Sequence, residues 1–456
     1  MLDGQETRPE SSVEVDHISP VVIPRAEHPI SRKMIDEEAL KVLYRLHHHG
    51  YLSYLVGGSV RDLLLGRIPK DFDVATNAHP HEIKALFRNS RVIGRRFRLV
   101  HVFFKDGKVV EVSTFRSRSE FEEVETEEGT LIRTESFGTP EEDAFRRDLT
   151  INGLFYNIAD FSIIDCVGGM EDLERRIIRT IGDPEERLQQ DPVRMIRVLR
   201  HAARTGFTIE ERTYQAILHN RDAIQTCSPS RVRDEFLRDL KEGVAEPSLR
   251  LMLETRLLLS MFPELQRAFG NRNPSRGRAR QLFLLLFGLV DRLLSMGRDV
   301  PESVILALFL TPYLQAVTPD HPFLGERERQ AYRIQTIRWT THQIVGPFSF
   351  PRGTKDMASQ ILIAQPILMK AIQRGGLLRR LRAKKYFKEA LLYFGIEAEA
   401  KGERVPAALR HTLPADFLPW WPRDHEREHK RRRSRRRRRF PPAPSADPGG
   451  RHPTSE

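Results

Sequence analysis

The sequence contains only two cysteines, Cys166 and Cys227, in 456 residues. Two cysteines cannot build the disulfide framework of a small secreted domain, and neither has the neighbours of a zinc site, so we expect a reducing, cytoplasmic location. Long apolar runs are also missing. The longest, Leu282 to Val290 and Val304 to Leu310, fall well short of the roughly 20 residues that cross a bilayer, so we expect no integral membrane association. The acidic, polar N-terminus predicts no secretory signal.

Acidic residues are the minority: 62 Asp and Glu stand against 74 Lys and Arg, which gives a formal charge of +12. A basic chain of this kind favours polyanionic partners such as RNA, DNA or an anionic membrane surface. Much of the excess lies near the C-terminus, where Lys430, Arg431, Arg432 and Arg433 begin a basic run. We expect this run to hold RNA through its phosphates, with a merely solvated tail as the alternative.

Composition and periodicity divide the chain into five segments. Residues 1–33 are rich in Pro, Ser and Glu and predict a disordered leader. Residues 34–175 mix β-rich runs with helical patterns, which predicts an α/β or α+β head on a mixed sheet. Helical periodicity then predicts an elongated all-α part, with a neck over residues 176–265 and a body over residues 266–415. The composition of residues 416–456 predicts a disordered Arg-rich tail.

A double glycine and an Asp-x-Asp pair form the first candidate site. Gly57 and Gly58 follow a β-rich run and let backbone N–H groups approach an anion, and Arg61 adds a cation for phosphate. Asp71 and Asp73 lie two residues apart on an expected strand, so their carboxylates share one face and suit Mg²⁺. Each pattern alone is more often structural, whereas together they favour a site for triphosphate and metal. The Walker signature is absent, which disfavours a P-loop ATPase.

Arg147, Asp148 and Asn152 form the second candidate site. Helical spacing places Asp148 and Asn152 one turn apart on one face, where a carboxylate and an amide can bind ribose hydroxyls while Arg147 holds phosphate. An ordinary capped helix is the alternative. Glu111, on a further predicted strand, is a candidate third metal ligand if that strand pairs beside Asp73, and otherwise an exposed residue on an edge strand.

Four arginines follow an aspartate in the third candidate site. Asp191 is expected to cap a helix on which Arg194, Arg197, Arg200 and Arg204 fall within about 120° of one another. No acidic residue stands four positions from any of them, so they repel one another unless an anion is bound. A phosphate or a nucleobase therefore explains this stripe better than a solvated helix face does.

Together these motifs resemble the nucleotidyltransferase superfamily, in its branch of bacterial poly(A) polymerases and tRNA CCA-adding enzymes. The segment from Gly57 to Asp73 looks like the catalytic motif of that branch. Residues 147–152 look like its ribose motif, and residues 191–200 look like its base-reading helix. Residues 230–235 are similar to the helix-stabilising segment that follows. The resemblance covers about residues 35 to 265.

The resemblance implies template-independent transfer of AMP from ATP to RNA 3′ ends with release of pyrophosphate. The enzyme would act in mRNA processing and RNA decay, where protein partners would join it. Asp71, Asp73 and Asp148 would be catalytic, with Mg²⁺ on the first two in a two-metal site. The nucleotide-binding residues would be Gly57, Gly58, Arg61, Arg147, Asn152, Asp191, Arg194, Arg197 and Arg200.

A basic stretch containing Arg95, Arg96 and Arg98 bears on the choice between the two activities of this branch. It is similar to the poly(A) polymerase side, since the CCA-adding side usually has a shorter and less basic stretch there. We therefore expect poly(A) addition, with RNA bound at these arginines. A tRNA CCA-adding or A-adding enzyme is the nearest alternative. A non-catalytic RNA-binding protein with a nucleotidyltransferase-like head is another, although the three aspartates argue against it.

Overall fold

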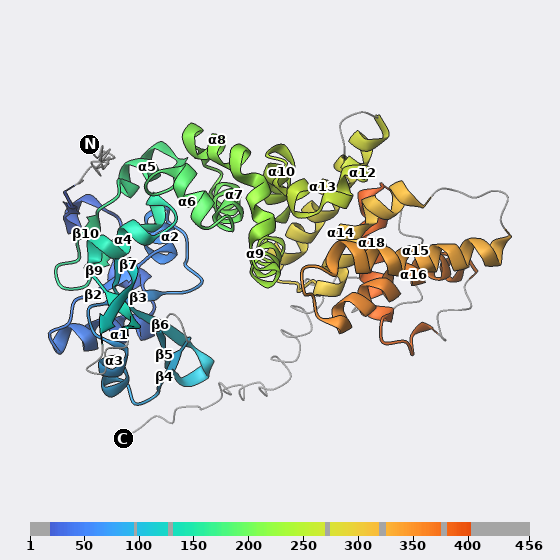
Figure 1. Ribbon diagram of the computed structural model, residues 1–456. Coiled ribbons are helices and arrows are strands. Elements are labelled where there is room, and N and C mark those ends of the chain that lie inside the picture. The colour runs from blue at the N-terminus through green and yellow to red at the C-terminus, as the bar shows by residue number, and fades with distance from the viewer. Residues whose placement is uncertain are drawn as a thin grey trace, which may run out of the picture. The chain divides into compact units, whose positions relative to one another are not determined.

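The computed structural model of the chain describes residues 19–94, 98–125, 131–269, 274–318, 325–374 and 381–402. An N-terminal sheet is followed by helices (Figure 1). The chain divides into two compact units. The first comprises Met1–Asp239 with Pro247–Pro263, and the second comprises Leu240–Glu246 with Glu264–Glu456. The five-segment division of the sequence stays a prediction.

Eight strands of the described residues form a mixed sheet in the order β1-β10-β9-β2-β3-β6-β5-β4. Their bounds are Val21–Ile23 (β1), Ser53–Val56 (β2), Asp73–Thr76 (β3), Ser90–Ile93 (β4), Leu99–Phe103 (β5), Val109–Thr114 (β6), Leu154–Asn157 (β9) and Ile163–Asp165 (β10). Strands β3 and β6 are parallel, and the other neighbours are antiparallel. Val74 pairs with Val112, so Asp73 and Glu111, each one residue earlier, lie at the same end of the parallel pair.

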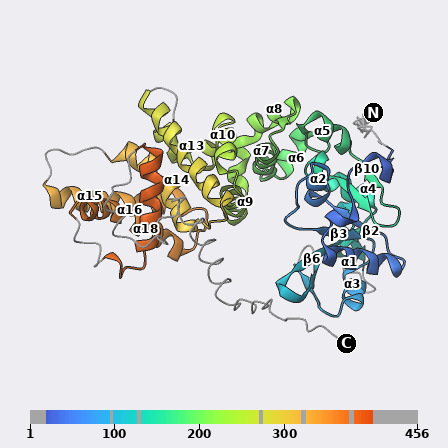
Figure 2. The same ribbon diagram turned by 180° about the vertical axis from the view of Figure 1, so that it is seen from behind.

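Five helices accompany the sheet in the head. Their bounds are Glu37–His48 (α1), Gly58–Leu64 (α2), Pro80–Leu86 (α3), Pro140–Arg146 (α4) and Gly169–Arg175 (α5). Helix α1 begins where the Asp36 carboxylate accepts a hydrogen bond from the Glu38 backbone N–H, and it buries an apolar stripe that includes Val42 and Leu46. Helices α1 and α3 pack beside each other against the sheet (Figure 2). Strands β7 (Arg116–Glu125) and β8 (Leu131–Phe137) pair with each other in a separate two-stranded sheet.

Aromatic side chains fill the core of the head. The rings of Tyr54, Phe115 and Phe155 contact one another with centroids 5.7 to 6.4 Å apart. Cys166 belongs to the same cluster, and burial raises the pKa of its thiol to about 12, so it packs as an apolar residue. The guanidinium of Arg147 lies over the Phe155 ring at 5.2 Å. The aromatic core therefore packs directly against Arg147, one of the predicted nucleotide-binding residues.

The described part of the predicted leader is ordered, which corrects the expectation of disorder over residues 1–33. Val21–Ile23 forms β1 and pairs antiparallel with β10 at the edge of the sheet. Ile30 is fully buried, and His28 is 6% exposed with its Nε2 2.9 Å from the carbonyl oxygen of Phe161. The sequence did not predict this short apolar strand, because the leader is mostly polar and three residues are too few for a periodic signal.

Helices and short connecting elements make up the remainder. The further helices of the first unit are α6 (Pro184–Gln190), α7 (Arg194–Thr205), α8 (Glu211–Asn220), α9 (Pro229–Lys241), α10 (Ala245–Glu254) and α11 (Leu257–Met261), with α9 ending and α10 beginning in the second unit. Two short parallel strands are Ile177–Ile178 (β11) and Thr208–Ile209 (β12). The 3₁₀ turns are Arg25–Glu27, Arg32–Met34, Lys105–Gly107, Thr150–Asn152 (η4), Arg221–Thr226 and Pro263–Leu265.

The regular elements in the described part of the second unit are all helices. Its helices are α12 (Gln266–Phe269), α13 (Pro274–Ser295), α14 (Glu302–Val317), α15 (Glu326–Val345), α16 (Arg352–Arg374) and α18 (Phe387–Ala400). Helix α14 is buried from Ser303 to Leu314 and packs against α13, α15, α16 and α18. Of the helices in the described ranges, none combines the length and apolar character that a bilayer crossing requires.

Candidate active site

The double glycine turns the chain from β2 into α2. Gly57 has a φ of +70°, a conformation that side chains with a Cβ rarely adopt. A Cβ at Gly57 would lie 3.2 Å from Nη1 of Arg147, and one at Gly58 would lie 3.3 Å from Nη2 of Arg61. The positive φ at Gly57 therefore favours glycine there, and a side chain at either position would require an arginine to shift by a few tenths of an ångström.

Arg61 is not the exposed phosphate-binding cation that the sequence predicts. Its side chain is 1% exposed, and Nε and Nη2 donate to Oδ1 of Asp62 at 2.9 and 2.8 Å. Nη1 donates to Oδ1 of Asn152 at 2.6 Å and lies 3.2 Å from Nδ1 of His201. Asp62 also pairs with Arg204 at 2.8 Å. Arg61 therefore links helix α2, which follows the glycine turn, to Asn152 of the ribose motif. Its burial and these partners leave no exposed part of the guanidinium to bind a phosphate.

Three carboxylates gather at the end of the parallel strand pair. Strand β3 begins at Asp73, so Asp71 precedes the strand rather than alternating along it, which corrects the expected geometry. Burial, followed by the charges of Glu111 and Asp71, raises the pKa of Asp73 to about 6. Strand β6 lies between β3 and β5, so Glu111 is not on an edge strand, and its Oε2 lies 3.3 Å from Nε2 of His101.

These carboxylates fit a magnesium ion by the chemistry of their donors. No three His, Cys, Asp or Glu side chains in the described ranges enclose a complete metal site. Mg²⁺ does not need such a cage, because it usually takes one or two protein carboxylates and completes its shell with waters and substrate phosphates. Burial raises the pKa of Asp73 most, and the charges of Glu111 and Asp71 raise it further, so a divalent cation would relieve the repulsion among the three carboxylates. Asp73 and Asp71 are thus the residues that would hold the ion, with Glu111 beside them.

We expect Asp73→Asn to stabilise the metal-free protein at neutral and higher pH. An acid whose pKa is raised in the folded state, here from 3.8 to about 6, supports folding fully at low pH and loses that support as the pH rises through about 6. In EDTA, Asp73→Asn should raise the free energy of unfolding by up to about 3 kcal/mol at about pH 8 and by little at about pH 4. Urea denaturation measures both values.

The same experiment tests the metal site without an activity assay. Adding Mg²⁺ should stabilise the wild type more than Asp73→Asn, because the variant loses a charged oxygen ligand. Glu171→Gln is the matched control, since Glu171 is 61% exposed on α5 and pairs with Arg175 at 2.8 Å. Equal stabilisation of the wild type and Asp73→Asn by Mg²⁺ would contradict the assignment.

The ribose motif is a tight turn and not the α-helix that its spacing predicts. Asn152 ends the 3₁₀ turn η4, and strand β9 follows at Leu154. The turn still brings Nδ2 of Asn152 to 3.4 Å from Oδ1 of Asp148, so the predicted pair does share one side. Burial would raise the pKa of Asp148, but the charge of Arg197 and the Asn152 amide hold it below its usual value. Asp148 is therefore a carboxylate acceptor at physiological pH.

The pair expected to read the base lies together with unpaired polar atoms. Asp191 ends α6 and does not cap α7, which begins at Arg194 after Val193. Oδ2 of Asp191 accepts from Nη2 of Arg231 at 2.7 Å and lies 3.5 Å from Nε of Arg194. Oδ1 of Asp191 and both Nε and Nη1 of Arg194 are buried without a hydrogen-bond partner. Buried polar atoms are rarely left unpaired, so a ligand with donors and acceptors fits here.

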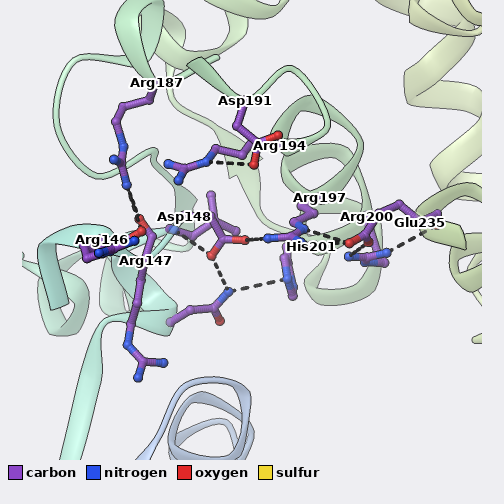
Figure 3. A network of polar contacts seen from close by, with 12 residues as sticks. Arg146, Arg147, Asp148, Arg187, Asp191, Arg194, Arg197, Arg200, His201 and Glu235 are labelled. Atoms are coloured by element: carbon purple, nitrogen blue, oxygen red, sulfur yellow. Dashed lines mark hydrogen bonds and ion pairs between the residues drawn. The ribbon is translucent and has the colours of Figure 1, made fainter. Parts of the chain in front are cut away.

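Two arginines of the basic stripe are neutralised by helix α9, which corrects the expectation that they lack carboxylate partners. Nε of Arg197 donates to Oε1 of Glu235 at 3.0 Å, and Nη1 lies 3.7 Å from Oδ2 of Asp148 (Figure 3). Arg200 is 4% exposed and pairs with Glu235 at 2.7 Å and Asp239 at 3.0 Å. Arg200 therefore holds α7 to α9, and the structure gives it no nucleotide-facing side.

Arg187 belongs to the site although no sequence pattern singled it out. Its Nη2 donates to the carbonyl oxygens of Phe145, Arg146 and Arg147 at 3.3, 2.9 and 2.8 Å (Figure 3). It thereby satisfies the C-terminal carbonyls of α4, from which Arg147 and Asp148 extend. Burial and then the charge of Arg194 lower the pKa of Arg187 to about 10. A single arginine on a short helix carries no local signal that could have revealed this role.

The residues predicted to bind RNA are largely outside the described ranges. Arg95 and Arg96, and the run of Lys430, Arg431, Arg432 and Arg433, fall outside them. Arg98 is exposed and directly precedes β5. Its role in RNA binding stays a prediction.

Two family models match the chain. The Poly A polymerase head domain matches residues 53–179, which include the glycine turn, the carboxylates and the ribose motif. A second model, described as the probable RNA and SrmB-binding site of polymerase A, matches residues 206–269. The second range includes Glu235 and Asp239, the partners of the arginine stripe.

Relatives of two kinds are similar to the chain. Poly(A) polymerase I from Salmonella typhi is 42% identical over 321 residues, which are 69% of this chain and 68% of that protein. The CCA-adding enzyme of Bacillus pumilus is 37% identical over 219 residues, or 48% and 53% of the two chains. The crystal structure of the Bacillus stearothermophilus CCA-adding enzyme in complex with CTP aligns with a TM-score of 0.54 and 27% identity, covering 87% of this chain and 82% of that one.

Proposed function

The chain belongs to the family of bacterial poly(A) polymerases, and from its site we propose template-independent transfer of AMP from ATP to RNA 3′ ends with release of pyrophosphate. The observation that carries this proposal is a buried set of polar atoms without hydrogen-bond partners, Asp191 Oδ1 and Arg194 Nη1, beside the ion pair of Arg194 Nε with Asp191 Oδ2. A fixed acceptor beside fixed donors can read one nucleobase edge without a template strand. This set is linked to the catalytic head through Arg197, which contacts Asp148.

The polar groups around the glycine turn support a bound triphosphate. Nη1 of Arg147 lies against Gly57, and Nη2 of Arg147 donates to Asp143 at 2.7 Å, which fixes the guanidinium in place. Nε of Arg147 is buried without a partner. Gly57, Gly58 and Arg147 would hold the phosphates, whereas Arg61 and Arg200 would support the site from the protein interior.

Asp71 and Asp73 would hold Mg²⁺, with Glu111 as a third carboxylate. When bound, Mg²⁺ would lower the pKa of the attacking RNA 3′ hydroxyl and offset charge at the α-phosphate. The protein residues would position the two substrates: Asp148 and Asn152 hold the ribose, and Asp191 with Arg194 holds the adenine. Such positioning supplies most of the catalysis in phosphoryl transfer.

The proposed reaction also bears on the location of the enzyme, its RNA substrates and its protein partners. We propose a cytoplasmic enzyme that acts on mRNA and other RNA 3′ ends, alongside protein partners of RNA decay. Arg95, Arg96, Arg98 and the basic run that starts at Lys430 would hold the RNA through its phosphates, so binding should weaken with rising salt.

An incorporation assay separates this function from its alternatives. Purified protein is incubated with Mg²⁺ and either a generic 5′-labelled RNA or a tRNA lacking its 3′ CCA end, with ATP alone or CTP alone. We expect long A tails on both RNAs and little incorporation of C. Defined C addition restricted to the tRNA would instead favour the CCA-adding activity. No pyrophosphate release with either nucleotide would leave only a non-catalytic RNA-binding role.

A further inference from the structure

His201 lies on α7, seven residues after Arg194, and contacts the ribose motif. Its Nδ1 lies 3.2 Å from Nη1 of Arg61, and its Nε2 lies 3.4 Å from Nδ2 of Asn152. His201 is partly buried and belongs to the same group of polar contacts as Asn152 and Asp148. The proposed reaction assigns ribose binding to Asp148 and Asn152 and gives His201 no part.

The contact with Arg61 decides which ring nitrogen of His201 carries the proton. A guanidinium has only donors, so Nδ1 must be the unprotonated acceptor. A second ring proton would face the Arg61 charge, and burial together with that charge lowers the pKa of His201 well below its ordinary value. The ring is therefore neutral, with its single proton on Nε2.

Arg61 also decides the orientation of the Asn152 amide. Its Nη1 donates to Oδ1 of Asn152 at 2.6 Å, which leaves the amide nitrogen facing Asp148 and His201. Nδ2 of Asn152 and Nε2 of His201 are then both donors, 3.4 Å apart, and neither can accept from the other. The charge-assisted bond from Arg61 outweighs the longer neutral contact, so this arrangement is the favoured one.

Two adjacent N–H donors beside a carboxylate match one chemical group. A hydroxyl oxygen can accept from both donors while its own proton goes to Oδ1 or Oδ2 of Asp148. We propose that Nε2–H of His201 donates to a ribose hydroxyl of the incoming ATP, completing a three-point hydroxyl site with Asn152 and Asp148. This inference rests on the proposed function and makes His201 a specificity residue for ribonucleotides.

Two substitutions separate the donor at Nε2 from the acceptor at Nδ1. His201→Asn places an amide oxygen near the position of Nδ1, which can still accept from Arg61, but it has no donor at the position of Nε2. His201→Gln places an amide N–H near the position of Nε2. We measure kcat/KM for single-nucleotide addition with ATP, 2′-deoxy-ATP and 3′-deoxy-ATP, and thermal unfolding confirms that each variant is folded.

We expect His201→Asn to lose selectivity for ATP over one deoxy analogue and His201→Gln to retain it. His201→Asn should lower kcat/KM for ATP about tenfold and leave it unchanged for the deoxy analogue that lacks the bound hydroxyl. His201→Gln should keep the wild-type ratio of ATP to that analogue. His48→Phe, at an exposed position on α1, is the control for removing a histidine.

Three outcomes would overturn the inference. Equal losses for ATP and both deoxy analogues in His201→Asn would mean that His201 only supports the fold. A wild-type selectivity ratio in His201→Asn would mean that no hydrogen bond from Nε2 is used. A wild type that adds no AMP from ATP at all would refute the proposed function itself, and this inference with it.

Discussion

Asp73→Asn is expected to reduce AMP incorporation at least about 10³-fold, which corresponds to about 4 kcal/mol of transition-state stabilisation. Asp73 lies at the start of β3, and burial, followed by the negative charges of Glu111 and Asp71, raises its pKa to about 6. An amide keeps the shape of the side chain but loses the charge that would hold Mg²⁺. Asp71→Asn should act in the same direction. Single-turnover extension of a labelled RNA with saturating ATP measures the loss.

RNA binding should survive this substitution. Because RNA phosphates are expected to be held by arginines and lysines and not by Asp73, the affinity measured by fluorescence anisotropy with a labelled oligonucleotide should change less than about twofold. Glu171→Gln removes one exposed carboxylate from the same unit and should retain full activity. Extension at the wild-type rate by both Asp71→Asn and Asp73→Asn would refute the assignment of these carboxylates.

Arg200→Met is expected to lower the free energy of unfolding by about 3 to 5 kcal/mol. Arg200 is 4% exposed, and its removal would leave Glu235, at 7% exposed, and the fully buried Asp239 without their main cation. A buried carboxylate that loses its partner is far more costly than a broken surface pair. Urea denaturation of the whole protein measures the change.

A matched substitution and a kinetic measurement separate this structural role from nucleotide binding. Arg212→Met removes the same charge from an exposed pair, in which Arg212 is 73% exposed and lies 3.2 Å from Asp183, so it should cost no more than about 1 kcal/mol. At a temperature where Arg200→Met is folded, its KM for ATP should stay within about threefold of the wild type. A stable Arg200→Met protein with a strongly raised KM would restore the nucleotide-binding role that the sequence predicts.

Local patterns predicted much of the site because they depend on near neighbours in the chain. Strand signals placed Asp73 and Glu111 on separate strands, and the glycine pair marked the turn with a positive φ at Gly57. The spacing of Asp148 and Asn152 predicted that they face each other. They do so although the segment is not an α-helix: Asp148 precedes the 3₁₀ turn that contains Asn152, and the turn brings the two side chains within 3.4 Å of each other.

The sequence-based predictions were wrong mainly about which carboxylates neutralise the arginines. Helical periodicity placed Arg197 and Arg200 on one face of α7, but the carboxylates that neutralise them come from α9, at Glu235 and Asp239. Arg61 likewise reads as a surface cation and is instead buried against Asp62. Pairings between residues so far apart in the chain leave no periodic signal, so a single sequence cannot reveal them.

The sequence by itself determined the mixed head, the helical body, the family and the residue types that meet at the site, because turns, strand alternation and helix faces are set by short stretches of chain. Only the tertiary structure decided which charges remain available to substrates. Asp191 and Arg194 have buried polar atoms without a hydrogen-bond partner, while the guanidinium groups of Arg61 and Arg200 are bonded to side chains in the protein interior. The physical reason is that burial and long-range pairing, and not the residue type, set whether a side chain can bind a ligand or must support the fold.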